Sequence, residues 1–582
     1  MIRLESDVLV IGAGGAGMYA AIAAARDGCD VQLIDRSLIG RGGATVMAQM
    51  TVAVALGEEC PDHWEHHLAD TLVAGRGLCD PALAQLLCES APLRIREMDA
   101  WKVGWAREDG HLKQVHAPGH DRARCVYVDF LNTGPAVSRT LRTQLNRIDA
   151  IRRIGDVLIT DIVVQEGEAV GAVGLHLVSG EPVALEAKSV VIATGGLTRL
   201  YRRNSGSLNT GGDGYALALR AGAELIDMEF VQFFPIGHLA PRMIGMDPIM
   251  WDPFRYKLGG RLLNAEGVEF ADRYGPVESG NYVLTRDVAT YAIFKEVEAG
   301  RGSPAGGAYL SFAHVPEAEL RKAFGPVIDR LAKNGIDLTK MPVEVAPIAH
   351  YHMGGVRVDT SMETRVPNLF AAGEAVGGAN GANRLSGNAI SEAFVFGERA
   401  GTAAAARAKG RGASAWRAAT GAAELSLFGE RGSAAGEANT AALIVELQAL
   451  MADYAGPFRT ETKLSLALAR LEQMYAQLGG LPPSRNERYD MVHLDWLDLR
   501  NMLQVAQCVV LAALQRKESR GAHQREDFPG LLPEWETNQA VTWRDGKLSL
   551  ARTAQTNRAS DEMKPIGRRK GESPVRSDRI VQ

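Results

Sequence analysis

The hydrophobic pattern at the start of the chain predicts a strand, a glycine turn and a helix in close succession. The β-branched run Asp7–Ile11 leads into GAGGAG at residues 12–17, and an alanine-rich helical stretch follows to Ala25. A second apolar run, Val31–Ile34, ends in Asp35. In such a unit the glycines permit a tight turn, a close approach of pyrophosphate to the backbone, and close packing of helix on strand. An acid about 20 residues further on accepts hydrogen bonds from a ribose diol, so the pattern predicts a dinucleotide site.

Two later apolar runs also end on glycine turns. The run at 189–194 closes on a Gly-Gly pair, and the run at 369–372 closes on Gly373 and Glu374, whose carboxylate we expect to accept from a ribityl hydroxyl. The glycine-rich loop at residues 40–45 would add backbone N–H groups beside the phosphates and a flavin. An NAD enzyme does not need this loop, so the sequence predicts FAD rather than NAD.

Apolar positions in the C-terminal third recur at the i, i+3, i+4 spacing of helices. They follow a Gly- and Ala-rich stretch at 409–437 and form two sets: Leu443, Leu447, Leu450 and Met451, then Leu464, Leu468, Leu471 and Tyr475. The spacing predicts a helical domain that ends near residue 550. Beyond residue 553 the chain is polar, contains proline and is basic at 568–570, which predicts a flexible or partner-binding tail.

Composition narrows the classes of protein. The chain has 582 residues, of which 46% are apolar and 23% charged, and this predicts a globular protein of several domains. A net charge of −5 gives no sign of a nucleic-acid surface. The six cysteines form no CxxC pair, so we predict no metal site in this chain, neither zinc nor an iron–sulfur cluster. We find no secretory signal pattern and no uninterrupted apolar stretch near the ~18–20 residues that span a bilayer, so we expect a cytoplasmic protein whose membrane contact, if any, is made through a partner.

Seven motifs occur in order along the chain. They are GAGGAG at 12–17, ATGG at 193–196, NTGGDG at 209–214, DMEFVQF at 227–233, AHYHMGG at 349–355, GANRLSGNA at 381–389 and KESRGAHQREDFP at 517–529. With these motifs the chain resembles the flavoprotein subunits of the succinate dehydrogenase and fumarate reductase family, which also includes L-aspartate oxidase. The last motif is closer to the dehydrogenase and reductase subunits than to the oxidases, which implies a partner subunit that carries iron–sulfur clusters.

The resemblance implies an α/β protein with a Rossmann-like FAD-binding domain, an inserted α+β capping domain and a C-terminal helical domain. The FAD-binding domain is expected in two parts, at 1–234 and 350–435, with the capping domain at 235–349 between them. The helical domain is expected at 436–552 and the tail at 553–582.

The glycine pattern and the resemblance together assign a set of residues to the FAD site. The set comprises Gly12, Gly14, Gly15, Gly17, Asp35, Arg36, Gly42, Gly43, Thr45, Gln49, Ala193, Thr194, Gly195, Asp213, Glu374, Arg384, Asn388, Ala389 and Ile390. Ala44 stands where dehydrogenases of this family carry the histidine that bonds covalently to the flavin. We therefore expect non-covalent FAD, which favours reduction of an unsaturated acid or oxidase-like turnover.

Hydride transfer between a flavin and a carbon next to a carboxylate requires a cation on that carboxylate and a proton donor or acceptor on the opposite face. The resemblance implies that Arg384 and His350 bind the carboxylate and that Arg286 transfers the proton. Asp252 and Arg255 keep the three-residue spacing of the proton relay of the family, although an ordinary salt bridge is the alternative. The expected substrate is a small carboxylic acid.

The chain departs from the family at the expected substrate site. Phe234 stands where a histidine helps to grip a second carboxylate, Ile236 replaces a small hydroxyl residue, and Trp251 replaces a threonine. A pocket edge with fewer polar donors stabilises a second carboxylate poorly, because an unpaired buried charge is costly. Our hypothesis is a substrate with a single carboxylate, and the alternative is an ordinary C4 dicarboxylate that other residues bind.

Three classes of function are compatible with the motifs. The first is an electron-transfer subunit that works with an iron–sulfur partner, the second is a self-sufficient oxidase resembling L-aspartate oxidase, and the third is a non-catalytic flavin-binding protein. The presence of Arg286, His350 and Arg384 argues against the third class.

Overall fold

The structure is a computed structural model, and it describes most of the chain. The described residues are 1–129, 131–243, 249–251, 258–274, 286–412, 416, 439–482, 488–544 and 546–553. They divide into two compact units. The first unit contains Met1–Arg202, Gly206–Val231 and the described residues from Tyr351 onward, and the second contains Arg203–Ser205 and Gln232–His350.

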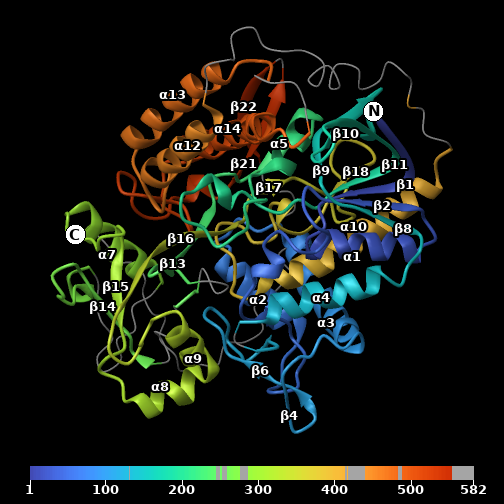
Figure 1. Cartoon of the computed structure of the whole chain (residues 1–582). Coiled ribbons are helices and arrows are strands. Elements are labelled where there is room, and N and C mark those ends of the chain that lie inside the picture. Colours follow the sequence, from blue (N-terminus) through green and yellow to red (C-terminus); the bar gives the residue numbers. More distant parts are fainter. Residues whose placement is uncertain are drawn as a thin grey trace. The chain divides into compact units, whose positions relative to one another are not determined.

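The first unit is built on a seven-stranded sheet in the order β8-β2-β1-β11-β10-β9, with β18 paired to β11 (Figure 1). The strands are β1 (Ile2–Ile11), β2 (Val31–Ile34), β8 (Ile151–Ile154), β9 (Val157–Gln165), β10 (Glu168–His176), β11 (Glu181–Ile192) and β18 (Leu369–Ala371). Strands β8, β2, β1, β11 and β18 run parallel, whereas β10 is antiparallel to β9 and β11. The predicted strands at 31–34 and 189–194 thus flank the first strand, which brings their C-terminal ends to one edge of the sheet.

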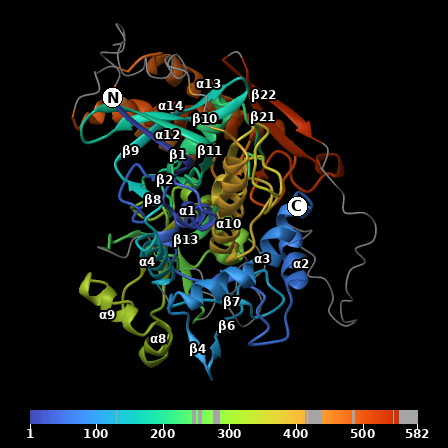
Figure 2. The same cartoon turned by 90° about the vertical axis from the view of Figure 1, so that its right-hand side faces the viewer.

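Helices cover this sheet. They are α1 (Gly15–Arg26), α2 (Trp64–Ala74), α3 (Pro81–Ala100), α4 (Thr133–Leu145), α5 (Asp213–Arg220) and α10 (Asn388–Lys409). Helices α1 and α10 lie side by side in both views (Figures 1 and 2). Their approach is close because a Cβ atom at Gly401 would lie 2.2 Å from the carbonyl oxygen of Ala20. The helix that carries the predicted residues 388–390 therefore packs directly on the helix of the glycine turn.

The C-terminal residues belong to the first unit and are only partly helical. The predicted helices are confirmed as α12 (Thr440–Tyr454) and α13 (Glu461–Leu478), and a third long helix follows, α14 (Met491–Gln515). The chain then adds two strands, β21 (Asn538–Arg544) and β22 (Lys547–Thr553), to a sheet with β12 (Leu225–Ile226) and β17 (Gly355–Val356). The expectation of a purely helical C-terminal domain was wrong, because this hairpin pairs with a strand at Leu225–Ile226, far earlier in the sequence.

Within the described residues, one helix is long and apolar enough to cross a membrane. This helix is α14, and 78% of its most apolar window is buried inside the protein. Its N-terminal half also carries Asp498, whose carboxylate is ion-paired within the first unit. These are the properties of a core helix.

The second unit has mixed helix and strand content. Its sheet has the order β13-β16-β15-β14, made of β13 (Val231–Ala240), β14 (Arg261–Leu263), β15 (Ala308–Ser311) and β16 (Val343–His352). The helices are α7 (Arg286–Glu298), α8 (Glu317–Phe324) and α9 (Pro326–Lys333). The main chain leaves the first unit after Val231 and re-enters it at Tyr351. The predicted domain boundaries near these positions stay predictions.

Shorter elements complete the described residues. They are β3 (Val52–Ala53), β4 (Arg107–Glu108), β5 (His111–Leu112), β6 (Gln114–Val115), β7 (Cys125–Val126), β19 (Phe458–Arg459), β20 (Gln524–Arg525) and the 3-10 helices Thr45–Met47, Thr198–Leu200, Ala271–Arg273, Gly373–Ala375 and Pro533–Trp535.

Candidate FAD and substrate site

The glycine turn between β1 and α1 has the shape that a pyrophosphate site requires. Gly12 has a φ of +102°, and a Cβ atom there would lie 2.5 Å from the carbonyl oxygen of Ala193. A Cβ atom at Gly17 would lie 1.8 Å from the carbonyl oxygen of Gly12. At Gly14, in contrast, a Cβ atom would meet nothing within 4 Å. Two glycines therefore serve packing, whereas Gly14 borders open space at the N-terminus of α1, where no side chain caps the helix.

Asp35 lies at the end of β2, beside this turn. Its Oδ2 accepts from the Ala13 N–H at 2.7 Å, and its Oδ1 accepts from the N–H and the hydroxyl of Ser37, both at 2.8 Å. Each oxygen of a carboxylate can accept two hydrogen bonds, so the carboxylate can be oriented by Ala13 and still accept from a ribose hydroxyl.

The loop at residues 40–49 also contacts the turn. The Gly15 N–H donates to Thr45 Oγ1 at 3.1 Å, and the Gly43 N–H donates to Ser207 Oγ at 2.9 Å. A Cβ atom at Gly42 would lie 2.6 Å from Asn209 Nδ2. Thr45 is therefore placed beside the first turn of α1, as the FAD prediction requires. Gln49 lies just after the 3-10 helix that Thr45 begins.

The Ala-Thr-Gly segment after β11 contains a buried polar atom without a partner. Thr194 Oγ1 is buried and has no hydrogen-bond partner among the described residues. It lies so close to α5 that a Cβ atom at Gly214 would be 2.2 Å away. Buried hydroxyls are nearly always hydrogen-bonded, so an orphaned one at this edge of the sheet fits a bound cofactor. The open space at Gly14 and the Thr194 hydroxyl together fit the predicted FAD.

Glu374 follows β18 in the 3-10 helix Gly373–Ala375. Its Oε1 accepts from the His352 N–H at 3.1 Å, and burial raises the pKa of its carboxyl to about 7. A Cβ atom at Gly196 would lie 2.3 Å from the same oxygen. Glu374 is thus fixed next to the Gly-Gly turn that follows Thr194.

Asn388 begins α10, behind a left-handed Gly387 with a φ of +85°. Its side chain is fully buried, with Oδ1 2.8 Å from His67 Nε2 and Nδ2 donating to Thr71 Oγ1 at 3.2 Å. Burial lowers the pKa of His67 to about 3, so its imidazole is neutral and Nε2–H is the donor to Asn388. The Asn388 side chain is engaged by protein groups, and the contribution of residues 388–390 to the cofactor is expected from the backbone at the helix start.

Two residues assigned to the FAD site, Arg36 and Asp213, belong to an ion-pair network. Arg36 Nη1 lies 3.0 Å from Asp213 Oδ2 and 2.8 Å from Asp498 Oδ1, and Arg199 Nη1 lies 2.5 Å from Asp498 Oδ2. Asn501 Nδ2 donates to Asp213 Oδ1 at 3.0 Å. This network ties the end of β2 to α5 and α14. Sequence reasoning missed Asp498, which is 462 positions from Arg36 and lies outside every motif.

Arg384 is a buried cation of the first unit. Its side chain is 8% exposed, its guanidinium carbon lies 4.5 Å from the ring centre of Tyr351, and its Nη1 donates to the Leu385 carbonyl oxygen at 3.1 Å. The Tyr351 hydroxyl donates to Glu392 Oε2 at 2.7 Å. Neither Tyr351 nor Glu392 was assigned to the site from the sequence, although both lie within or next to matched motifs.

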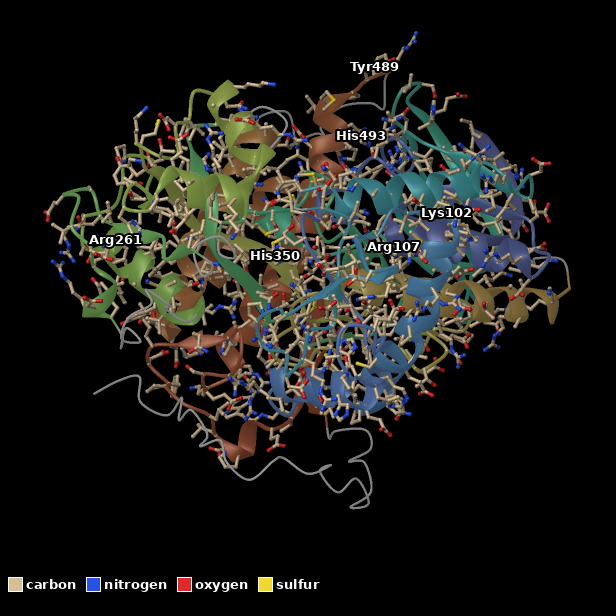
Figure 3. All side chains as sticks on the ribbon, turned by 90° about the horizontal axis from the view of Figure 1, so that it is seen from below. Lys102, Arg107, Arg261, His350, Tyr489 and His493 are labelled. Carbon is tan, nitrogen blue, oxygen red and sulfur yellow. The ribbon has the colours of Figure 1, made fainter. Side chains whose placement is uncertain are left out.

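His350 is the last residue of the second unit and lies in β16 (Figure 3). Its Nδ1 is 2.7 Å from the Ser205 hydroxyl. The ring of Phe234 packs against the imidazole edge to face, with ring centres 5.6 Å apart. Ser205 is placed by the pairing of residues 203–205 with Ala349, because its N–H donates to the Ala349 carbonyl oxygen at 2.9 Å.

The apolar replacements at the expected pocket edge have different environments. Phe234 contacts His350, whereas Trp251 is fully buried and its Nε1–H donates to His238 Nδ1 at 3.1 Å. Ile236 is also fully buried. The prediction that Trp251 and Ile236 form a pocket edge therefore needs correction, because both have the environment of core residues of the second unit.

The predicted proton-transfer residues are described only in part. Arg286 is the first residue of α7, and its side chain lies outside the described part of the structure. Asp252 and Arg255 both lie outside the described residues. Their proposed relay stays a prediction. Within the described ranges, no group of three or more His, Cys, Asp or Glu side chains is placed to hold a metal ion.

The motif at 517–529 forms a buried charge network around the segment that leads to the second unit. Arg516 Nε lies 2.6 Å from Glu229 Oε1, and Arg516 Nη1 and Arg520 Nε lie 3.0 Å and 2.6 Å from Glu518 Oε1. The guanidinium of Arg516 also lies 5.0 Å from the ring centre of Phe230. This conspicuous motif therefore anchors residues 229–230, just before the chain leaves the first unit.

Comparisons with known proteins agree with this site. The family model of the FAD binding domain matches residues 7–390, and the model of the fumarate reductase flavoprotein C-terminus matches residues 445–570. A subunit of the fumarate reductase (CoM/CoB) of Methanothermobacter marburgensis is 37% identical over 91% of this chain and 96% of its own length. L-aspartate oxidase of Streptomyces coelicolor is 33% identical over 90% of this chain and 89% of its own length.

A solved structure extends the comparison to the fold. Mycobacterium smegmatis Sdh1 in complex with UQ1 matches with a TM-score of 0.86 and 35% identity, over 95% of this chain and 94% of that chain. The protein belongs to the family of FAD-dependent oxidoreductases acting on CH–CH bonds that contains the fumarate reductase and succinate dehydrogenase flavoprotein subunits and L-aspartate oxidase.

Proposed function

We propose that the protein interconverts a saturated and an α,β-unsaturated carboxylic acid, as a flavoprotein subunit that exchanges electrons with an iron–sulfur partner. The observation that carries this proposal is the buried guanidinium of Arg384, held over Tyr351 in the same unit as the glycine turn. A buried cation of this kind suits a carboxylate, because the planar guanidinium can bind both carboxylate oxygens.

Bound FAD supplies the hydride chemistry, and the protein supplies binding, orientation and proton transfer. Gly14 and the N-terminus of α1 would receive the pyrophosphate, and Asp35 a ribose hydroxyl. Arg384 and His350 would bind the substrate carboxylate. Arg286 would hold the proton that is exchanged with the carbon next to that carboxylate, supplied through the relay at 252–255.

The substrate we propose has one carboxylate. Phe234 occupies one side of His350 with an aromatic ring that offers no hydrogen bond to a second carboxylate. If this is correct, Phe234→His should improve the binding of fumarate relative to a monocarboxylic enoate by about tenfold. Phe234→Leu is the matched control, because it separates loss of the ring from gain of a donor. Equal fumarate binding in all three proteins would contradict the proposal.

The FAD is proposed to be non-covalent. Ala44 precedes Thr45, and a methyl side chain cannot form a bond to the flavin. Acid precipitation of the purified protein should release all of the flavin into the supernatant. Flavin fluorescence that stays with the protein on a denaturing gel would show a covalent link elsewhere.

The iron–sulfur partner is supported by the names of relatives. The fumarate reductase relative from Methanothermobacter marburgensis is by its name one subunit of a larger enzyme. Attachment through such a partner would also allow a cytoplasmic, membrane-peripheral location. Co-purification of a tagged chain from its native cells tests this, and the expected companion shows iron and acid-labile sulfide.

L-aspartate oxidase-like turnover is the second candidate. It is favoured by the 33% identity to such an oxidase and by Ala44. The two functions differ in the electron acceptor, since an oxidase turns over in air and releases hydrogen peroxide. L-aspartate-dependent peroxide release by the isolated chain would establish the second candidate.

Ligand binding tests the proposal at the level of the site. The FAD-loaded protein is titrated with saturated and unsaturated mono- and dicarboxylates, and the flavin absorbance is followed. The proposal expects a spectral change with monocarboxylates that is lost in Arg384→Met. No response to any acid in the wild-type protein would overturn it.

A further inference from the structure

The guanidinium of Arg384 is supported by a group of buried polar side chains that has no role in the reaction proposed above. Tyr351 presents its ring face to Arg384 at 4.5 Å. The Tyr351 hydroxyl donates to Glu392 Oε2 at 2.7 Å, and Asn380 Nδ2 donates to the same oxygen at 2.7 Å. The contacts join β16 to α10 through the loop that carries Arg384, and all four residues belong to the first unit.

The position of Glu392 is costly for a carboxyl group. Its side chain is 0% exposed, and Tyr351 and Asn380 are only 4% and 2% exposed. Its second oxygen, Oε1, accepts no hydrogen bond from any described residue. Burial raises the pKa of Glu392 to about 7, and Arg384 counteracts this rise. A buried acid whose place a glutamine could fill without this cost is expected to have a function.

We propose that Glu392 is a positioning residue for Arg384, acting through Tyr351 and fixed by Asn380. The inference rests on the proposed function, in which Arg384 binds the carboxylate of the substrate. A phenol that donates its proton to a carboxyl group carries more electron density on its ring, so the ring face attracts a cation more strongly. Glu392 therefore holds the guanidinium without touching it.

The indirect arrangement has a consequence for substrate binding. A salt bridge to a carboxylate uses the N–H groups in the plane of a guanidinium, which are the same groups that bind a substrate carboxylate. A ring contacts the face of the guanidinium instead. Support by Tyr351 thus orients Arg384 without placing a competing carboxylate in its plane.

The test uses the FAD-loaded full chain and three substitutions. Glu392→Gln keeps the shape and removes the charge, Tyr351→Phe keeps the ring and removes the hydroxyl, and Tyr351→Leu removes the ring. With propanoate as the probe, followed by the flavin absorbance, the dissociation constant should rise about fivefold in the first two variants and more than about tenfold in the third. The loss should fall on binding and KM, with kcat less affected.

Tyr274→Phe is the matched control. The Tyr274 hydroxyl donates to the buried Glu296 at 2.7 Å, so the substitution removes the same type of hydrogen bond from the second unit without touching Arg384 or Tyr351. Propanoate binding should stay at the wild-type value in this variant. A loss equal to that in Tyr351→Phe would mean a general effect on stability and would overturn the inference.

A crystal structure of FAD-loaded Glu392→Gln separates this inference from the proposed function. The inference expects the Arg384 guanidinium to leave the face of Tyr351 or to become mobile there. If wild-type protein binds no carboxylic acid but the guanidinium still moves, the proposed function fails and the positioning role stands. An unmoved guanidinium together with wild-type propanoate binding overturns the positioning role.

Discussion

Glycines 14 and 17 belong to one turn but are required for different physical reasons. At Gly17 the obstacle to a side chain is the protein itself, the backbone oxygen of Gly12 at 1.8 Å. At Gly14 no protein atom lies within 4 Å of a Cβ atom, so the protein alone would accept alanine. The open space at Gly14 is the space that we assign to the pyrophosphate.

Substitution of these two glycines by alanine should therefore separate folding from cofactor binding. Gly17→Ala should destabilise the apoprotein by about 2 kcal/mol or more, because backbone cannot move away cheaply. Gly14→Ala should leave the unfolding of the apoprotein unchanged and weaken FAD binding about tenfold. Urea unfolding and flavin fluorescence quenching measure the two effects. Full FAD affinity in Gly14→Ala would place the pyrophosphate elsewhere.

The buried carboxyl of Glu392 also makes a pH-dependent contribution to stability. Its pKa rises from 4.5 to about 7 on folding, so between these values the folded protein keeps a proton that the unfolded chain has lost. The stability from this group is present below its unfolded pKa and is lost as the pH rises through the folded pKa. Several buried histidines have lowered pKa values and act in the opposite direction at acidic pH.

A comparison with Glu392→Gln isolates this contribution, because the histidines are the same in both proteins. The unfolding free energy of the variant relative to wild type should rise by about 3 kcal/mol between about pH 5 and pH 8. Urea unfolding of the two apoproteins at several pH values measures the difference. A difference that does not change with pH would show that Glu392 titrates normally in the folded protein.

At the scale of elements, the C-terminal motif holds the strand segment that leads out of the first unit. Arg516 joins Glu229, in the segment before β13, to Glu518, and all three side chains are fully buried. Removal of one member of a buried ion network leaves the others uncompensated in a medium of low dielectric constant.

Arg516→Met is therefore expected to lower the unfolding free energy by about 3–5 kcal/mol. Arg470→Met is the control, because Arg470 pairs with Glu446 at 2.6 Å on the surface, where the side chains are 29% and 44% exposed. This control should cost less than about 1 kcal/mol. Thermal unfolding of both variants compares them. Equal small losses would mean that the motif has no structural role.

At the scale of the whole molecule, local patterns predicted much of the fold and less of the site. The glycine turn, the strands around it and helices α12 and α13 follow from periodicity and turn residues that are close in sequence. The ion network of Arg36 with Asp498 and the pairing of β12 with β21 depend on residues hundreds of positions apart, for which no local signal exists. Trp251 was assigned to a pocket because its neighbours in sequence belong to one, whereas the fold directs its ring into the core.

The central claim is that reduced FAD in this protein passes hydride to an unsaturated acid whose carboxylate is bound by Arg384. It is tested most directly by anaerobic stopped-flow reoxidation of the photoreduced protein with but-2-enoate and with fumarate. We predict reoxidation in a single turnover, faster with but-2-enoate than with fumarate, and slowed at least about a hundredfold in Arg384→Met. Reduced flavin that no unsaturated acid reoxidises, or reoxidation at the wild-type rate in Arg384→Met, would contradict the claim.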